Sequence, residues 1–165
     1  PNDCGSSVGV SIVSDRAALE AALSEAAKWG RRVLVEKKIV GRELTVGVLD
    51  GRALPPVEII PKSGFYDYRN KYQGTTLEIC PAEIPAGITS LVSSLSLRAF
   101  EVLRLDGYAR FDFILDANGT PWCLEANALP GMTPTSLLPQ EAAAVGISYP
   151  DLCERILMLS MRKRG

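Results

Sequence analysis

Histidine is absent from the 165-residue chain. Its absence excludes Ser-His-Asp and Cys-His catalysis within the chain, and it excludes histidine-ligated zinc. A metal site in this sequence would therefore use oxygen or thiolate ligands. Oxygen ligands favour Mg²⁺, Ca²⁺ or Mn²⁺.

A charge excess and a long apolar run are also lacking. The 18 basic and 19 acidic side chains give a formal charge of −1, so bulk charge predicts neither a nucleic-acid partner nor a membrane partner. No apolar run is long enough to span a bilayer, and the opening PNDCGSSVGV does not have the pattern of a signal peptide. The four cysteines have no CxxC spacing, which predicts reduced, mostly buried thiols in a cytosolic protein.

The chain is 47% hydrophobic, enough to bury a core. Helices are predicted over about 15–29, with Ser14 as N-cap and Gly30 as the end, and over about 88–105, 136–145 and 150–161. In the 88–105 helix we expect Leu91, Leu95 and Val102 to be buried. Strands are predicted over 32–39 and in a hairpin at Asp50-Gly51. This order predicts an α+β fold with an antiparallel sheet.

Residues 61–81, PKSGFYDYRNKYQGTTLEICP, show no convincing period. A connection of this length without secondary structure is long for a simple link between elements, so we expect a functional loop or lid here.

The stretch RFDFILDANGTPWCLEAN has the alternation of a second hairpin. A two-residue turn at Asn118-Gly119 would place Asp112 opposite Glu125, and a four-residue loop would place it opposite Cys123 with Glu125 diagonal. Either register leaves Asp112, Glu125 and Asn127 on one face.

Two opposed carboxylates repel each other, and a divalent cation would turn that cost into a binding site. Asn127 would add a neutral oxygen ligand. The alternative is a solvated sheet face on which Arg110 neutralises one carboxylate. The residues alone leave these two interpretations open.

Three shorter stretches are compatible with nucleotide or substrate binding, each with an ordinary alternative. CGSSVGV, with Ser6 and Ser7, fits a phosphate loop or a surface turn. VEKKIVGRE offers Glu36 and Glu43 to adenine and ribose, or is a charged edge strand. PGMTPTSLLP places a glycine before a helix start, which suits either a substrate carboxylate or a simple helix cap.

In order along the chain, GSSVGV, VEKKIVGREL, GFYDYRNKY, ICPA, GYARFDFILD, LEANALPGMT and TSLLP resemble the D-alanine–D-alanine ligases of the ATP-grasp family. The resemblance implies part of the central ATP-grasp domain over residues 1–40 and the C-terminal ATP-grasp domain over 41–165, a mainly antiparallel sheet flanked by helices. It also implies that the N-terminal domain is absent from this chain.

The resemblance implies roles for individual residues. Asp112, Glu125 and Asn127 would be ligands of two Mg²⁺ (or Mn²⁺) ions. The residues implied to bind ATP are Glu36 at the adenine, Lys37 and Ile39 beside it, Glu43 at the ribose, Val10, Phe65 and Leu124 around the adenine, and Ser7 and Lys71 near phosphate. The residues implied in catalysis and substrate binding are Arg110 and Gly131 at the tetrahedral intermediate, Tyr72 hydrogen-bonded to Ser6 in the closed loop, and Ser136 with the Leu137 N–H at the second substrate's carboxylate.

The implied activity is ATP-dependent joining of two D-alanines through a D-alanyl phosphate, for peptidoglycan precursor synthesis in the cytoplasm, by a homodimer of the complete protein. Because the family's upstream half supplies other substrate and phosphate groups, we expect these 165 residues alone not to catalyse ligation. D-Alanine–D-lactate ligase is the first alternative, although Tyr72 resembles the dipeptide-forming type. Another ATP-grasp carboxylate–amine ligase and a nucleotide-binding fragment without catalysis also remain open.

Overall fold

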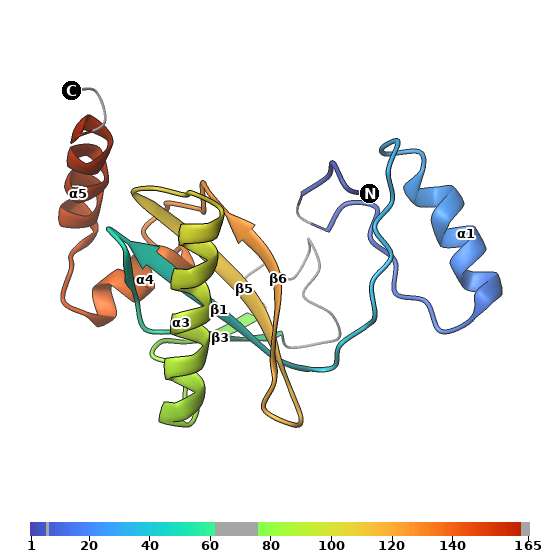
Figure 1. The fold of residues 1–165 in the computed structure, drawn as a ribbon, viewed down its shortest axis with the longest axis horizontal. Helices are drawn as coiled ribbons and strands as arrows, with labels where there is room; N and C mark the ends of the chain where they lie inside the picture. Colours follow the sequence, from blue (N-terminus) through green and yellow to red (C-terminus); the bar gives the residue numbers. More distant parts are fainter. Residues whose placement is uncertain (6, 62–75, 163–165) are drawn as a thin grey trace. The chain divides into compact units, whose positions relative to one another are not determined.

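The computed structural model describes residues 1–5, 7–61 and 76–162 (Figure 1). The chain forms two compact units: Pro1–Ile39 with Pro61–Thr76, and Val40–Ile60 with Leu77–Gly165. From the sequence we expected a domain boundary after residue 40, with 61–76 in the second domain. Among the described helices, none is long and apolar enough to cross a membrane.

The first unit contains one described helix, α1 (Arg16–Ala26). Its N-cap is Asp15 rather than the predicted Ser14, because the Asp15 carboxylate accepts a hydrogen bond from the Ala18 N–H at 2.8 Å. The helix also ends earlier than predicted, at Ala26 instead of near Gly30.

The strand predicted over 32–39 is wrong, because residues 32–40 form neither a strand nor a helix. A β-strand needs a neighbouring strand for its ladder of hydrogen bonds. Within the described residues, no strand pairs with this segment, and the Arg32 carbonyl instead accepts a single bond from the Asn2 N–H at 3.0 Å. An apolar sequence pattern does not by itself supply that neighbour.

The second unit is built on a six-stranded sheet in the order β4-β3-β1-β5-β6, with β2 paired to β1. The strands are β1 (Gly41–Leu49), β2 (Arg52–Ala53), β3 (Val57–Pro61), β4 (Thr76–Ile79), β5 (Tyr108–Asp116) and β6 (Pro121–Asn127). The β1 pairs with β2, β3 and β5, and the β5–β6 pair, are antiparallel. The predicted α+β class with an antiparallel sheet is therefore confirmed.

The first predicted hairpin is confirmed at its turn. Leu49 pairs with Arg52, and the two residues between them, Asp50 and Gly51, have φ values of 50° and 69°. Positive φ at both positions is the requirement of a type I′ turn, which the Asp-Gly pair satisfies. Strand β4, by contrast, lies within the stretch that we expected to be without secondary structure.

Helix α3 (Ala86–Val102) covers one face of the sheet (Figure 1). That face of β1 and β5 carries alternating buried side chains: Leu44, Val46, Val48, Ala109, Phe111, Phe113 and Leu115. The helix buries Val92 and Ser96 and packs Leu95 on this core. The predicted buried face is wrong for Leu91 and Val102, which are 40% and 71% exposed.

Among the described residues of the second unit, helices α4 (Leu137–Ala144) and α5 (Tyr149–Arg162) pack against one end of the opposite face. Both helices are close to their predicted ranges and join a second cluster at the end of β1: Leu49, Leu54, Leu138, Ala142 and Leu152. The remaining side chains on this face of β1, β5 and β6 are mostly polar. They include five of the residues that the sequence analysis singled out: Glu43, Arg110, Asp112, Glu125 and Asn127.

The described cysteines differ from the prediction of mostly buried thiols. Cys123 and Cys153 are exposed, and Cys4 and Cys80 are only partly buried. All four are free.

Candidate functional site

The β5–β6 hairpin brings the predicted polar residues together. Asp112 lies directly opposite Glu125, and Arg110 directly opposite Asn127. The loop has three residues, 117–119, since Asp116 and Thr120 are hydrogen-bonded and Gly119 has a φ of 79°. Neither of the two loop lengths that we considered is the observed one.

A β-bulge reconciles this loop with the predicted pairs. The register shifts by one residue between Asp112 and Phe113, so β6 carries one extra residue there. Phe113 consequently pairs with Cys123, while Asp112 pairs with Glu125 as the two-residue turn would have required. The prediction that Asp112, Glu125 and Asn127 share one face is confirmed by their mutual contacts.

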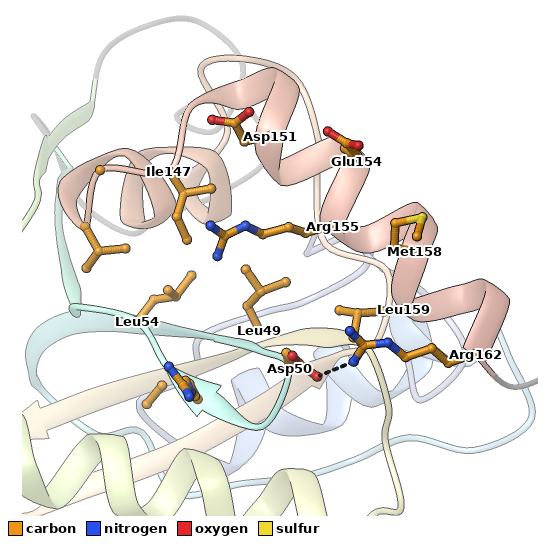
Figure 2. Close-up of a pocket in the computed structure, with 14 residues that line it drawn as sticks. Leu49, Asp50, Leu54, Ile147, Asp151, Glu154, Arg155, Met158, Leu159 and Arg162 are labelled. Carbon is orange, nitrogen blue, oxygen red and sulfur yellow. Dashed lines mark ion pairs between the residues drawn. The ribbon is translucent and has the colours of Figure 1, made fainter.

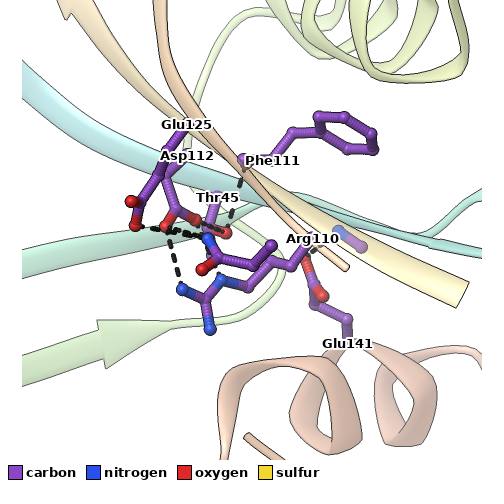
Figure 3. Close-up of polar contacts among 8 residues, drawn as sticks. Thr45, Arg110, Phe111, Asp112, Glu125 and Glu141 are labelled. Carbon is purple, nitrogen blue, oxygen red and sulfur yellow. Dashed lines mark hydrogen bonds and ion pairs between the residues drawn. The ribbon is translucent and has the colours of Figure 1, made fainter. Parts of the chain in front are cut away.

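Asp112 is the centre of these contacts (Figure 3). Arg110 donates to both carboxylate oxygens of Asp112, from Nε at 2.9 Å and from Nη2 at 2.8 Å. Thr45 Oγ1, from β1, donates to Asp112 Oδ1 at 2.6 Å. The Asn127 amide nitrogen bridges the two carboxylates, at 3.0 Å from Asp112 Oδ2 and 3.2 Å from Glu125 Oε1.

The ion pair of Arg110 and Asp112 is mostly shielded from solvent, with side chains 16% and 19% exposed. Burial alone would raise the pKa of the Asp112 carboxyl, but the hydrogen bonds and charge of Arg110, with the Thr45 hydrogen bond, outweigh it and lower that pKa. Burial likewise opposes the charge of Arg110, yet pairing with Asp112 raises the guanidinium pKa. Both groups are therefore charged at neutral pH.

The donor set fits a hard divalent cation. Two carboxylates and one carboxamide meet here, and Mg²⁺ uses one or two carboxylates together with substrate phosphates. In the described part of the chain, no group of three or more His, Cys, Asp or Glu could hold a metal ion, so phosphate oxygens would have to complete the shell. The structure shows the arrangement that we considered as the alternative, in which Arg110 neutralises one carboxylate, that of Asp112. The Arg110–Asp112 pair is mostly buried, whereas we expected it to be solvated. The metal-ligand role of Asp112, Glu125 and Asn127 stays a prediction.

Two site residues were missed by sequence reasoning. Thr45 stands in the alternating strand ELTVGVL, on the face opposite its buried Leu44 and Val46, where a hydroxyl is a weak indication of a contact. Glu141 lies in α4 with 0% exposure, among Leu137, Leu138 and Ala142. The signal that could have indicated it is an acid within an apolar helical stretch, and the sequence analysis did not use it.

The loop from β6 to α4 carries the predicted substrate residues. Ser136 is the N-cap residue of α4, but its hydroxyl makes no cap hydrogen bond and instead accepts from the Thr133 N–H at 3.0 Å. The N–H groups of the first turn, starting at Leu137, therefore have no side-chain cap. A Cβ on Gly131 would lie 3.0 Å from Ser136 Oγ, which shows how closely the loop backbone approaches the helix start.

Other predicted residues can be located only within their own units. In the first unit Val10 is 54% exposed, Ser7 has a φ of 58°, Glu36 and Lys37 are exposed, and Ile39 is half-buried. In the second unit Glu43 is half-buried on β1 and Leu124 is 51% exposed on β6. Ser6, Phe65, Lys71 and Tyr72 lie outside the described residues. Their roles in binding ATP and closing the loop stay predictions.

A cavity of about 880 Å³ lies elsewhere, between the β1–β2 turn and α5 (Figure 2). Leu49, Arg155 and Met158 are among its lining residues, and Arg162 approaches Asp50 to 3.8 Å across it. The lining contains none of the predicted site residues.

Comparison with known proteins identifies relatives along the whole chain. The family model described as "D-ala D-ala ligase C-terminus" matches residues 1–158. The D-alanine–D-alanine ligase of Methylacidiphilum infernorum is 48% identical over 161 residues, which cover 97% of this chain and 53% of that protein.

Solved structures agree in fold. A crystal structure of D-alanine–D-alanine ligase from Bacillus anthracis has a TM-score of 0.87 at 41% identity, and the match covers 99% of this chain and 54% of that one. A structure of the ligase from the same organism complexed with ATP has a TM-score of 0.83 at 36% identity, covering 94% and 50%. The chain thus spans about half the length of the relatives it matches. On this evidence, the chain belongs to the family of D-alanine–D-alanine ligase C-terminal domains.

Proposed function

We propose that the complete protein containing this chain joins two D-alanines at the expense of ATP, and that this chain holds the C-terminal half of the active site. The observation that carries the proposal is the convergence of Asp112, Glu125 and Asn127 on one sheet face. Family membership supports the choice of reaction.

The proposed reaction has two steps. The carboxylate of the first D-alanine attacks the γ-phosphorus of ATP, which forms D-alanyl phosphate and releases ADP. The amine of the second D-alanine then attacks the acyl carbonyl, the C–O bond to phosphate breaks, and the amine loses a proton to give the dipeptide. Cations held by Asp112, Glu125 and Asn127 would neutralise and align the phosphates.

The chain's own residues supply positioning and charge. Arg110 would donate hydrogen bonds to the oxyanion of the tetrahedral intermediate, where preorganised charge is most effective. The Ser136 hydroxyl and the uncapped Leu137 N–H would hold the second substrate's carboxylate at the start of α4. Lys71 and Tyr72, in the predicted loop, would bind phosphate and exclude water from the acyl phosphate.

The magnesium dependence of ATP binding tests whether Asp112, Glu125 and Asn127 form a metal site. Titration calorimetry of ATP into the protein, with and without Mg²⁺, should show tighter binding with the cation in the wild type. D112N should lose that gain, and D50N, the same change in an exposed turn, should keep it. Equal ATP affinity with and without Mg²⁺ in the wild type would contradict the assignment.

The ligase activity itself needs the complete protein. Incubation with ATP and D-alanine should yield ADP, phosphate and D-alanyl-D-alanine in equal amounts, and addition of D-lactate across a pH series should not divert the product to the depsipeptide. Preferential depsipeptide formation would establish the D-lactate alternative. ATP binding without any product would favour a nucleotide-binding role.

A further inference from the structure

Glu141 is buried in a way that the proposed reaction does not explain. Its exposure is 0%, and its Oε1 accepts a hydrogen bond from the Gly47 N–H at 2.8 Å. Its Oε2 is buried and has no hydrogen-bond partner among the described residues. A buried carboxyl with one unsatisfied oxygen is costly, so a position of this kind calls for an explanation.

The sheet makes room for this carboxyl next to Arg110. Gly47 of β1 pairs directly with Arg110 of β5, and a Cβ on Gly47 would overlap Glu141 Oε2 and Leu138 Cδ1. Figure 3 shows Glu141 reaching from α4 to the sheet beside Arg110. The charge of Arg110 acts on the Glu141 carboxyl, although the two groups form no ion pair in this structure.

Cation binding at Asp112 would take the counter-ion of Arg110 away. Both carboxylate oxygens of Asp112 are occupied by the Arg110 guanidinium. Thr45 and Asn127 donate to the same two oxygens, so the carboxylate has no free acceptor position. If Asp112 ligates a cation, as the proposed function requires, one of these donors has to leave, and charge repulsion from the cation acts on Arg110 and not on the neutral Thr45 and Asn127. Arg110 would then be a mostly buried cation without its counter-ion, which is strongly unfavourable.

We propose that Glu141 is a positioning residue whose carboxylate replaces Asp112 as the counter-ion of Arg110 when a divalent cation engages Asp112. The inference rests on the proposed function, because it takes the cation at Asp112 from it. The exchange keeps Arg110 charged and held beside the reacting carbonyl. Glu141 itself touches neither substrate nor cation.

The charged and titratable groups that act on Glu141 come from two elements besides its own. Arg110 favours the ionised form, and Asp112 disfavours it. Cys80, directly after β4, is also affected by Glu141: burial and that neighbouring charge raise the pKa of the Cys80 thiol to about 11. Cys80 is therefore a neutral neighbour at working pH. Burial is the largest effect on the Glu141 carboxyl and raises its pKa, and a cation that offsets Asp112 leaves Arg110 as the main charge that acts against burial.

The direct test is a pH titration of the carboxyl ¹³C signal of Glu141 in the complete protein, assigned through its backbone amide, with Mg²⁺ and ADP as the probe. Without the probe, burial should place the midpoint of this titration above that of an ordinary glutamate. With Mg²⁺ and ADP the midpoint should fall, because the carboxylate then pairs with Arg110. A midpoint that does not change in the loaded protein would overturn the proposal, and this readout needs no variant to fold.

Kinetics of E141Q give a second test, since glutamine keeps the volume and the acceptor for Gly47. We expect kcat to fall about 10- to 100-fold with little change in KM for ATP. The acid limb of the wild-type kcat profile, where activity rises as Glu141 ionises, should be missing in E141Q. E154Q, the same change on the exposed side of α5, should retain the wild-type profile.

The outcomes separate this inference from the proposed function. A wild type that ligates, combined with an E141Q profile identical to that of E154Q, refutes the counter-ion exchange alone. A wild type in which the titration midpoint of Glu141 falls with Mg²⁺ and ADP, but which forms no dipeptide, refutes the ligase activity alone.

Discussion

Asp112 receives hydrogen bonds from Thr45, Arg110 and Asn127, which come from three neighbouring strands. A carboxylate held in this way needs no reorganisation to point into the site, but a cation has to compete with the Arg110 guanidinium for it. In the absence of a cation, Asp112 is thus paired with Arg110, and the same carboxylate would be a metal ligand once a cation binds. Both possible partners of Asp112 are cations, so electrostatic attraction decides between them.

At the residue scale, D112N tests the importance of that ion pair for folding. Asparagine keeps the shape but leaves Arg110, 16% exposed, without its counter-ion. We expect a loss of about 2 kcal/mol in the free energy of unfolding, measured by urea denaturation. D50N changes an exposed turn residue, at a position where asparagine suits the turn as well as aspartate does. Its free energy of unfolding should stay within about 0.5 kcal/mol of the wild-type value. Equal stability of the two variants would show that the ion pair contributes nothing.

Glu141 makes a prediction about pH that is independent of any ligand. Burial raises the pKa of the Glu141 carboxyl well above its usual value, whereas in the unfolded chain the pKa is about 4.3. The folded state therefore binds this proton more tightly, and the contribution is fully present below the unfolded pKa and is lost as pH rises through the folded pKa.

E141Q cannot titrate and should lack this contribution. Denaturation at a series of pH values above 5 should show the wild type losing stability relative to E141Q as pH increases. The difference between wild type and E154Q should not change with pH over the same range. A constant difference between wild type and E141Q would mean that the Glu141 pKa is not raised.

At the scale of elements, α4 approaches β1 closely because Gly47 has no side chain. A Cβ at this position would meet Glu141 and Leu138, both fully buried. We expect G47A to cost about 1–3 kcal/mol by overpacking, as measured by thermal or urea unfolding. G87A, in the first turn of α3 with nothing within 4 Å of the added Cβ, should instead be neutral or slightly stabilising. If G47A cost no more stability than G87A, the close contact of α4 with β1 would be contradicted.

The face of α3 can be tested with a pair of adjacent residues. Val92 is 0% exposed and Leu91 is 40% exposed, so V92A should lose about 2 kcal/mol and L91A much less, although leucine loses more atoms. Chemical denaturation of both variants measures the difference. A greater loss for L91A would support the face predicted from the sequence instead of the observed one.

The sequence predicts this fold wherever local patterning and turn chemistry agree. Asp50-Gly51 specified its turn, and period-2 alternation placed Asp112 and Glu125 on one face, even though a bulge and a three-residue loop produced the register. Helical period alone did not locate the buried face of α3, because Leu91 and Val92 are equally apolar and only the packing distinguishes them. The strand expected over 32–39 failed since pairing depends on a partner that the segment does not encode. Glu141 was missed because its environment is made by β1, nearly a hundred residues earlier in the chain.

At the scale of the whole molecule, the two faces of the sheet in the second unit have different compositions. One face is filled by α3 and an apolar core, which packs against β1 and β5. The other face carries Arg110, Asp112, Glu125 and Asn127, and α4 and α5 pack against one end of it. A sheet that is packed against a core on one face and positions polar groups on the other is well suited to phosphoryl chemistry, in which positioning and charge supply most of the catalysis. Since the chain spans about half of its relatives, the remaining groups of the proposed site would come from the other half.

The central claim is that Asp112, Glu125 and Asn127 together hold a divalent cation at the phosphates of ATP. Anomalous diffraction from crystals of the protein grown with Mn²⁺ and ADP measures this directly, because Mn²⁺ replaces Mg²⁺ and scatters anomalously. The account predicts a manganese peak in contact with oxygens of all three side chains, with Arg110 no longer paired to both oxygens of Asp112. A nucleotide-bound structure whose manganese lies away from these residues, with that pairing intact, would contradict it.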